Sequence, residues 1–190
     1  CSSGMSAIFL AIKKIAKDGD HIIRSASIYG GTDTLLRYTL PRFGIKTTFI
    51  EDFTPENIKK NIQKNTKLVY TETIGNPKGD VPDFVEIAET THSEKLPLIV
   101  DNTFAPSICK PFEHGADVIV YSCTKWLGGH GTSIGGAIVD SGKFNWGNGK
   151  FPEFTEPDPS YHGLKIWDAL SNVPGMGNVA FIIKARIQGM

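Results

Sequence analysis

The chain has 190 residues, of which 40% are hydrophobic, and this is enough for one domain with a sizeable core. Its 20 basic and 20 acidic residues cancel, so there is no net charge to attract nucleic acid or an anionic membrane. No apolar stretch approaches the ~20 residues that a membrane-spanning helix needs. We therefore expect a small-molecule partner, with no nucleic acid and no membrane.

The cysteines and histidines indicate a reducing compartment and no metal site. Three cysteines, an odd number without a short repeated spacing, do not form a disulfide framework, so cytoplasm is the expected location. No metal-ligand spacing exists with the cysteines or among four of the five histidines, namely His21, His92, His114 and His162. His130 is expected to belong to a structural turn. The chain starts at Cys1 and stops at Met190 within a helical pattern, which predicts a piece of something longer.

Strand and helix patterns alternate along the chain. A helix is expected first, with Met5, Ile8 and Ile12 on one face and Gly19 just beyond it. Two more helices are predicted from a cap followed by a proline in the first turn. Thr54 and Pro55 give this signal for one helix, and Pro82 marks the start of the other. Six β-rich segments occupy residues 21–27, 46–51, 67–73, 96–102, 117–123 and 134–140. This alternation predicts an α/β fold with a mainly parallel, mixed sheet and helices on both faces.

The regular pattern ends at residue 141. Residues 141–161 are rich in Gly, Pro and aromatic side chains, which is typical of a long ordered loop or of a linker to a second domain. We expect residues 1–160 to form the ligand-binding large domain. Residues 161–190 are expected to be the helical start of the connection to a missing C-terminal domain.

Two segments have the features of an anion site. The stretch "SSGM" leads directly into the first helix, whose free backbone N–H groups and dipole favour a phosphate. Ser122 and Thr124 flank Cys123 and could face one group together along an extended backbone. The alternative for "SSGM" is an ordinary capped helix without a ligand.

Two charges follow buried strands at the same edge of the sheet. Asp101 ends "LPLIVD" and Lys125 follows "VIVYSCT", and ligands of such sheets bind at the carboxyl ends of the strands. The pair is either a partly buried ion pair or two contacts to one ligand. A partly desolvated lysine is a usable amine nucleophile, and a carboxylate can hold a protonated ring nitrogen. Pyridoxal phosphate requires three binding groups: a phosphate site, a lysine amine and a carboxylate for the ring nitrogen.

Two further polar residues follow strands. Tyr29 precedes a Gly-Gly turn that could present its ring over a flat ligand, or it is a packing aromatic of the turn. Asn76 lies in an Asn-Pro turn and could donate a hydrogen bond to a phenolic oxygen, although a turn needs no ligand.

At these residues the sequence resembles a known family. The segment "DVIVYSCTKWLGGHG" is similar to the pyridoxal-phosphate attachment signature of the Cys/Met-metabolism enzymes, which include cystathionine synthases and lyases. The segments "SSGM", "YGGT", "ETIGNP" and "DNTFA" follow the order of that family. The resemblance implies the large domain of a fold-type I pyridoxal-phosphate-dependent transferase, in an assembly of identical subunits that is commonly a homotetramer.

The resemblance also implies a role for each candidate residue. Lys125 would form the Schiff base, Asp101 would hold the pyridine nitrogen, and Tyr29 would stack on the ring and assist proton transfer. Asn76 would contact the phenolic oxygen, and Thr103 would pack against the other face of the ring. The phosphate would be bound by Gly4, Met5, Ser122 and Thr124.

Within the family, the segments after Gly128 are most similar to the branch that acts on O-acetylhomoserine. That branch implies γ-replacement, in which sulfide displaces acetate and homocysteine is formed. The alternatives are γ-elimination or cystathionine synthase or lyase chemistry on the same fold. A further alternative is a non-catalytic cofactor-binding fragment, since these residues include neither the N-terminal segment nor the C-terminal domain that family members use.

Overall fold

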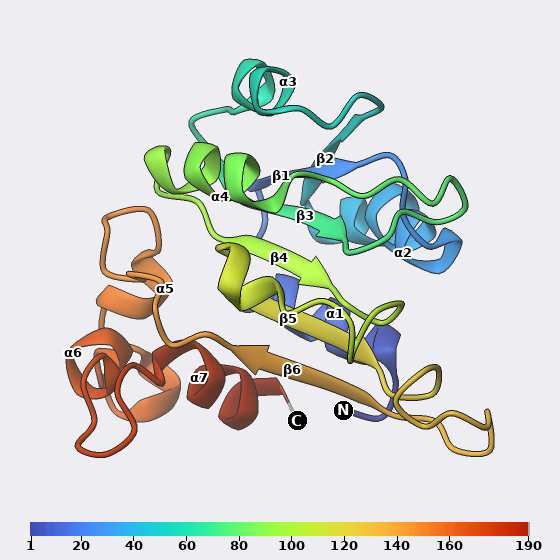
Figure 1. Ribbon diagram of the computed structural model, residues 1–190. Coiled ribbons are helices and arrows are strands. Elements are labelled where there is room, and N and C mark those ends of the chain that lie inside the picture. The colour runs from blue at the N-terminus through green and yellow to red at the C-terminus, as the bar shows by residue number, and fades with distance from the viewer. Residues whose placement is uncertain (190) are drawn as a thin grey trace.

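The computed structural model describes residues 1–189, whose centre is one six-stranded sheet in the order β2-β1-β3-β4-β5-β6 (Figure 1). Five strands are parallel, and β6 at the edge runs antiparallel to β5. The predicted mainly parallel, mixed sheet is thus confirmed. The strands are β1 (His21–Ser25), β2 (Lys46–Ile50), β3 (Thr66–Glu72), β4 (Leu98–Asp101), β5 (Val118–Ser122) and β6 (Gly136–Asp140).

Helices cover both faces of the sheet, as the strand and helix alternation predicts (Figure 1). One face packs against α1 (Gly4–Lys13), α7 (Ala180–Gly189) and the helical segment formed by α2 (Gly30–Thr34), η1 (Leu35–Thr39) and η2 (Leu40–Phe43). The other packs against α3 (Pro55–Asn61) and α4 (Phe84–Ser93). The shorter elements are η3 (Pro111–His114), α5 (Pro152–Thr155), η4 (Pro159–Tyr161) and α6 (Ile166–Leu170). None of the helices in this part of the chain is long and apolar enough to cross a membrane.

The central strands are apolar without alternation because both of their faces are buried. On β4, Ile99 belongs to the core on the α1 side, whereas Leu98 and Val100 belong to the core on the α4 side. All three side chains are fully buried. The strand therefore delivers its last residue, Asp101, to the same face as Ile99, because side chains two positions apart point the same way.

The predicted helix starts are confirmed in one case and corrected in another. Thr54 caps α3 with its side chain, and Pro55 occupies the first turn, where a missing N–H group costs no hydrogen bond. In α4 the cap is Asp83, whose carboxyl accepts the N–H of Glu86, and Pro82 lies outside the helix. An Asp side chain can accept the free N–H groups of a first turn, so it takes the cap position in preference to the proline before it.

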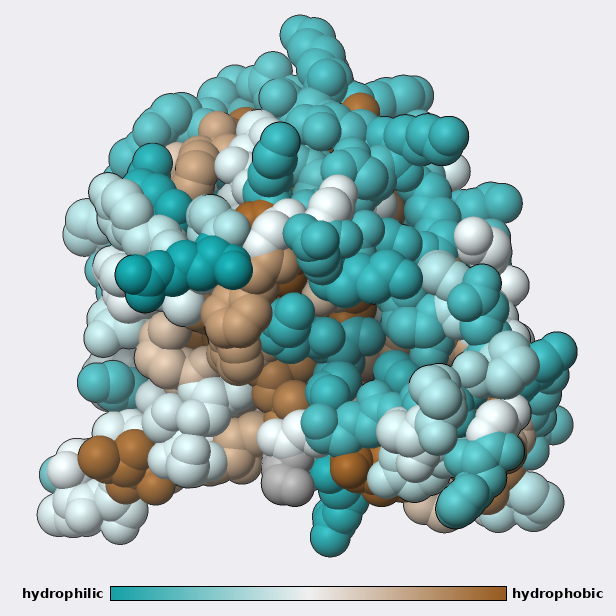
Figure 2. Space-filling model, turned by 180° about the vertical axis from the view of Figure 1, so that it is seen from behind, coloured by the Kyte–Doolittle hydropathy of each residue, from teal (hydrophilic) through white to brown (hydrophobic). Residues whose placement is uncertain are grey.

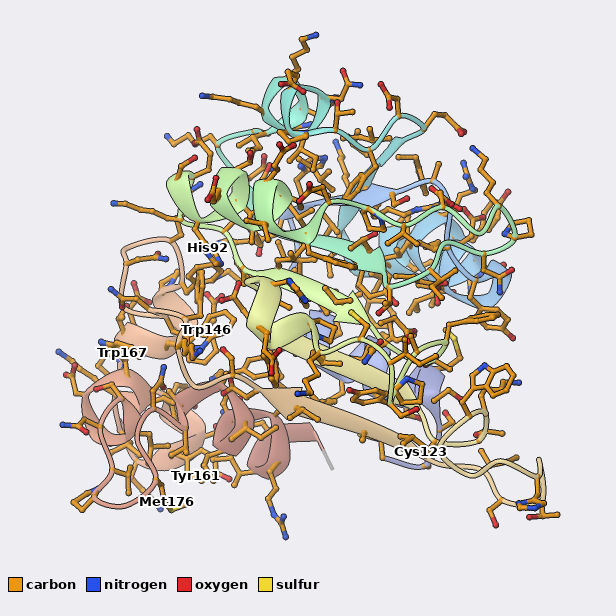
Figure 3. The ribbon with its side chains drawn as sticks, viewed as in Figure 1. His92, Cys123, Trp146, Tyr161, Trp167 and Met176 are labelled. Carbon is orange, nitrogen blue, oxygen red and sulfur yellow. The ribbon has the colours of Figure 1, made fainter. Side chains whose placement is uncertain are left out.

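The segment 141–161 contributes four aromatic side chains to the core, which favours an ordered loop through the first two thirds of the segment. Phe151 and Phe154 are fully buried around Trp146, with ring centroids 5.2 Å and 4.9 Å from the Trp146 ring. Phe181 of α7 stacks on the same ring at 5.1 Å. Large aromatic side chains gain stability from burial, which explains why a segment without a regular pattern is held against the sheet. Trp146 lies at the other end of the molecule from Cys123, which follows β5 (Figure 3).

Candidate active site

A cavity of about 410 Å³ lies at the carboxyl ends of the parallel strands, next to the N-terminus of α1. In the sheet, β2 lies on one side of β1 and β3 on the other. The direction in which successive strands are added therefore reverses between β1 and β3. Ligands of open α/β sheets bind beside such a reversal. Every residue predicted from the sequence lines this cavity, namely Gly4, Met5, Tyr29, Asn76, Asp101, Thr103, Ser122, Thr124 and Lys125.

The N-terminus of α1 has the features of an anion site. Ser3 caps the helix by accepting the N–H of Ser6, while the N–H groups of Gly4 and Met5 have no acceptor among residues 1–189. Gly4 packs so closely that an added Cβ would lie 2.5 Å from the Cβ of Ser122. A glycine is therefore required where α1 meets β5, and this contact brings backbone N–H groups and a hydroxyl to one place.

The two hydroxyls that flank Cys123 are not equivalent. Thr124 bonds to the backbone of Gly135, whose N–H it accepts at 3.2 Å and whose carbonyl oxygen lies 3.4 Å away. The Ser122 hydroxyl has no hydrogen-bond partner in the described part of the chain. Of the two hydroxyls, that of Ser122 is therefore the one left to bond with a ligand.

Asp101 is a buried carboxyl group surrounded by donors. Its Oδ1 accepts the N–H of Thr103 at 2.9 Å and the Thr103 hydroxyl at 2.5 Å, and its Oδ2 lies 3.3 Å from the Tyr70 hydroxyl. Burial raises the pKa of Asp101, and these donors act in the opposite direction. The Thr103 hydroxyl also accepts the N–H of Ser122 at 2.8 Å, so Thr103 links the ends of β4 and β5.

Lys125 lines the same cavity but lies beyond the end of β5, outside the sheet. No ion pair joins it to Asp101 among residues 1–189, so the ion-pair alternative does not describe this structure. Lys125 is exposed, because it follows the end of β5 in a turn. Both charged groups face the cavity and are free to contact one ligand.

Tyr29 stands at the mouth of the cavity, with 47% of its surface exposed. The two glycines after it form the first turn of α2 and not the separate turn that the sequence predicts. A side chain at Gly31 would lie 2.5 Å from the Tyr29 ring, so this glycine leaves room for the ring. Asn76 lines the cavity from the loop after β3.

Glu72, the last residue of β3, also lines this cavity and is not among the residues predicted from the sequence. Glu72 pairs with Asp101 across the two parallel strands and is only 5% exposed. Burial, together with the negative charge of Asp101, raises the pKa of Glu72 to about 8. The sequence signal that could have identified Glu72 is the one that identifies Asp101, namely a carboxyl residue at the end of an apolar strand.

These residues fit a flat aldehyde that carries a phosphate. Free N–H groups and a hydroxyl lie at the α1 end, an amine and a buried carboxyl face the same space, and the cavity volume lies in the range for small ligands. Fold and site define the large domain of a fold-type I pyridoxal-phosphate-dependent enzyme, an architecture shared with solved relatives. Residues 1–159 match the Cys/Met metabolism PLP-dependent enzymes, and the chain belongs to this family.

Similar proteins agree with this assignment. The chain is 50% identical to an O-acetyl-L-homoserine sulfhydrylase of Leptospira meyeri and 48% identical to a homocysteine synthase of Schizosaccharomyces pombe. These matches cover 100% and 98% of the chain, which spans 43% of the length of each relative.

A solved structure described as an O-acetylhomoserine (thiol)-lyase of Campylobacter jejuni superimposes with a TM-score of 0.88 at 36% identity. That match covers 99% of this chain and 46% of the other, which carries a pyridoxyl-lysine phosphate group.

Proposed function

We propose that this protein is a pyridoxal-phosphate-dependent enzyme of sulfur amino-acid metabolism that converts O-acetylhomoserine and sulfide into homocysteine and acetate. In this γ-replacement a C–S bond forms at Cγ and the C–O bond to acetate breaks. The observation that carries the proposal is the single cavity lined by Lys125, Asp101 and the N-terminus of α1. The sulfhydrylase and homocysteine synthase relatives support the choice of reaction within the family.

The phosphate would be held by the N–H groups of Gly4 and Met5 and by the Ser122 hydroxyl, with Thr124 beside them. The first N–H groups of α1 have no acceptor of their own, and the positive end of the helix dipole favours an anion there. Thr103 would keep this end of the site in register with Asp101, because its hydroxyl bonds to both strands.

When bound, pyridoxal phosphate supplies an aldehyde and a ring that accepts electrons from a substrate carbon. Lys125 would supply the amine that holds the aldehyde, and this amine would move a proton at the substrate Cα. The Asp101 carboxylate would hold a protonated ring nitrogen. The Tyr29 ring would cover one ring face and assist proton transfer. Asn76 would donate to the phenolic oxygen.

Further proposals concern the setting of this site. Residues 1–160 would be the cofactor-binding large domain, with 161–190 leading to a C-terminal domain, and the family match over residues 1–159 supports this boundary. The three free cysteines support the cytoplasm as the location.

The working form would be a homo-oligomer, with a tetramer as the expected size. Apolar side chains are exposed at the cavity rim, where Trp126 is 65% and Ile134 75% exposed. Apolar side chains also gather across the middle of the rear face of the molecule (Figure 2). Both observations support contact with a second copy.

Product analysis tests the proposed reaction. The protein loaded with pyridoxal phosphate is incubated with O-acetylhomoserine and sulfide, and homocysteine and acetate should form in equal amounts. Homocysteine formation should stop in Lys125→Ala, whereas Lys110→Ala, which changes an exposed lysine outside the cavity, should leave it unchanged.

Three other results would contradict the proposal. Acetate release without sulfide, with a keto acid and ammonia as products, would indicate γ-elimination. Cystathionine formation or cleavage in preference to homocysteine formation would indicate the cystathionine branch. Cofactor attachment without any turnover would indicate a cofactor-binding unit that is not catalytic by itself.

A further inference from the structure

Glu72 is a carboxyl group in the wall of the cavity for which the proposed chemistry has no role. It ends β3 between two strands that carry proposed site residues, since Asp101 ends β4 and Tyr29 follows β1. Its side chain lies on the cavity and is almost fully buried. A buried carboxyl group is costly unless its oxygen atoms have partners, so its hydrogen bond identifies what it does.

That partner is the backbone of Tyr29. Oε1 of Glu72 accepts the Tyr29 N–H at 2.7 Å. Tyr29 is the residue before α2, and its carbonyl oxygen accepts the N–H of Asp33 at 2.9 Å. The Tyr29 peptide is thus fixed on one side by the sheet and on the other by α2, although its ring is half exposed.

Among residues 1–189, the Tyr29 N–H is the one hydrogen-bond donor to the Glu72 side chain. Arg24 of β1 is buried nearby, but its guanidinium bonds to Asp33 and to the carbonyl oxygens of Ser25 and Ala26. Asp101 of β4 is the like charge paired with Glu72 across the two strands, and the Tyr70 hydroxyl of β3 is bonded to Asp101. Glu72 also lies on a second cavity, which is lined by the further carboxyl groups of Glu51, Asp52, Asp80, Asp83 and Glu86. Asp101 has three donors and Glu72 has one, and burial together with the negative charge of Asp101 raises the pKa of Glu72.

We infer that Glu72 is a positioning residue of the cofactor site, which fixes the Tyr29 ring over the cavity by accepting the Tyr29 backbone N–H. The inference rests on the proposed function for the identity of the ligand that Tyr29 covers. The contact itself belongs to the chain without cofactor and can be tested there.

The first test follows the Tyr29 amide by nuclear magnetic resonance between pH 4 and 9, a range that includes both the ordinary and the raised pKa of Glu72. Its proton resonance should move downfield as Glu72 ionises, because a carboxylate is a stronger acceptor than a neutral carboxyl group. The movement should disappear in Glu72→Gln, which keeps an acceptor oxygen but cannot ionise. Glu89→Gln, on the exposed face of α4, should titrate like the unmodified chain. An amide that titrates equally in Glu72→Gln, or that does not move in the unmodified chain, overturns the inference.

The second test uses the chain loaded with pyridoxal phosphate. Glu72→Ala should weaken cofactor affinity about tenfold, the effect of one lost hydrogen bond to a site residue, and should reduce the visible circular dichroism of the bound cofactor. Glu72→Gln should keep both within about twofold of the unmodified chain, because its amide oxygen still accepts the N–H. Equal affinity and equal dichroism in Glu72→Ala overturn the inference.

The two tests separate this inference from the proposed function. If the unmodified chain does not fix the cofactor at Lys125, the proposed function fails, and the Tyr29 amide titration still decides the role of Glu72. If Glu72→Ala does not fold, Glu72→Gln decides it alone.

Discussion

The raised pKa of Glu72 predicts a pH dependence of stability that one substitution removes. Glu72 has an ordinary pKa of 4.5 in the unfolded chain and of about 8 in the folded one. Below pH 4.5 both states carry the proton, and between 4.5 and 8 only the folded state does. Stability is therefore highest below the lower value and is lost as the pH rises through the upper one.

The size of this effect follows from the shift. The free energy of unfolding falls by at most about 1.4 kcal/mol per pH unit across the window, which amounts to roughly 4 to 5 kcal/mol as an upper bound. Asp140, whose pKa burial raises to about 6, adds a slope of the same sign. The contribution of Glu72 is therefore the difference between the unmodified chain and Glu72→Gln.

Urea unfolding at several values between pH 5 and 9 measures that difference. Glu72→Gln should match the unmodified chain near pH 5 and should be more stable by several kcal/mol near pH 9. Glu89→Gln serves as the control and should follow the unmodified chain throughout. Parallel stability curves for Glu72→Gln and the unmodified chain would refute the reasoning.

Three other substitutions test the site and the core. Gly4→Ala places a Cβ against Ser122 and should weaken pyridoxal phosphate binding at least tenfold by equilibrium dialysis, whereas Gly30→Ala meets open space and should not. Asp101→Asn should lower turnover by roughly 100-fold while cofactor attachment persists, since the carboxylate that stabilises the ring charge is lost. Trp146→Ala should cost about 3 to 5 kcal/mol in thermal unfolding without changing cofactor affinity, because that cluster lies at the other end of the molecule.

The strand ends could be predicted because two local signals agree. Apolar segments such as "LPLIVD" mark buried strands, and parallel strands bring their carboxyl ends to one edge. This rule predicts that Asp101 and Lys125 meet at one site, and both line the same cavity. The same rule applied to "KLVYTET" would have identified Glu72.

Other features depend on contacts between distant segments and had no local signal. The exposure of Lys125 depends on how far the β5–β6 turn extends beyond the sheet. The bond of Thr124 to Gly135 requires residues eleven apart to meet. The burial of Phe151 and Phe154 depends on Trp146 and on α7, and composition alone could not separate that packed segment from a linker.

Attachment of pyridoxal phosphate at Lys125 is the central claim of this account. The protein is incubated with the cofactor, reduced with borohydride, digested and mapped by mass spectrometry. The pyridoxyl phosphate group should be found on the peptide that contains Lys125, and it should be absent from Lys125→Ala. A group spread over other surface lysines, or retained in Lys125→Ala, would contradict the account.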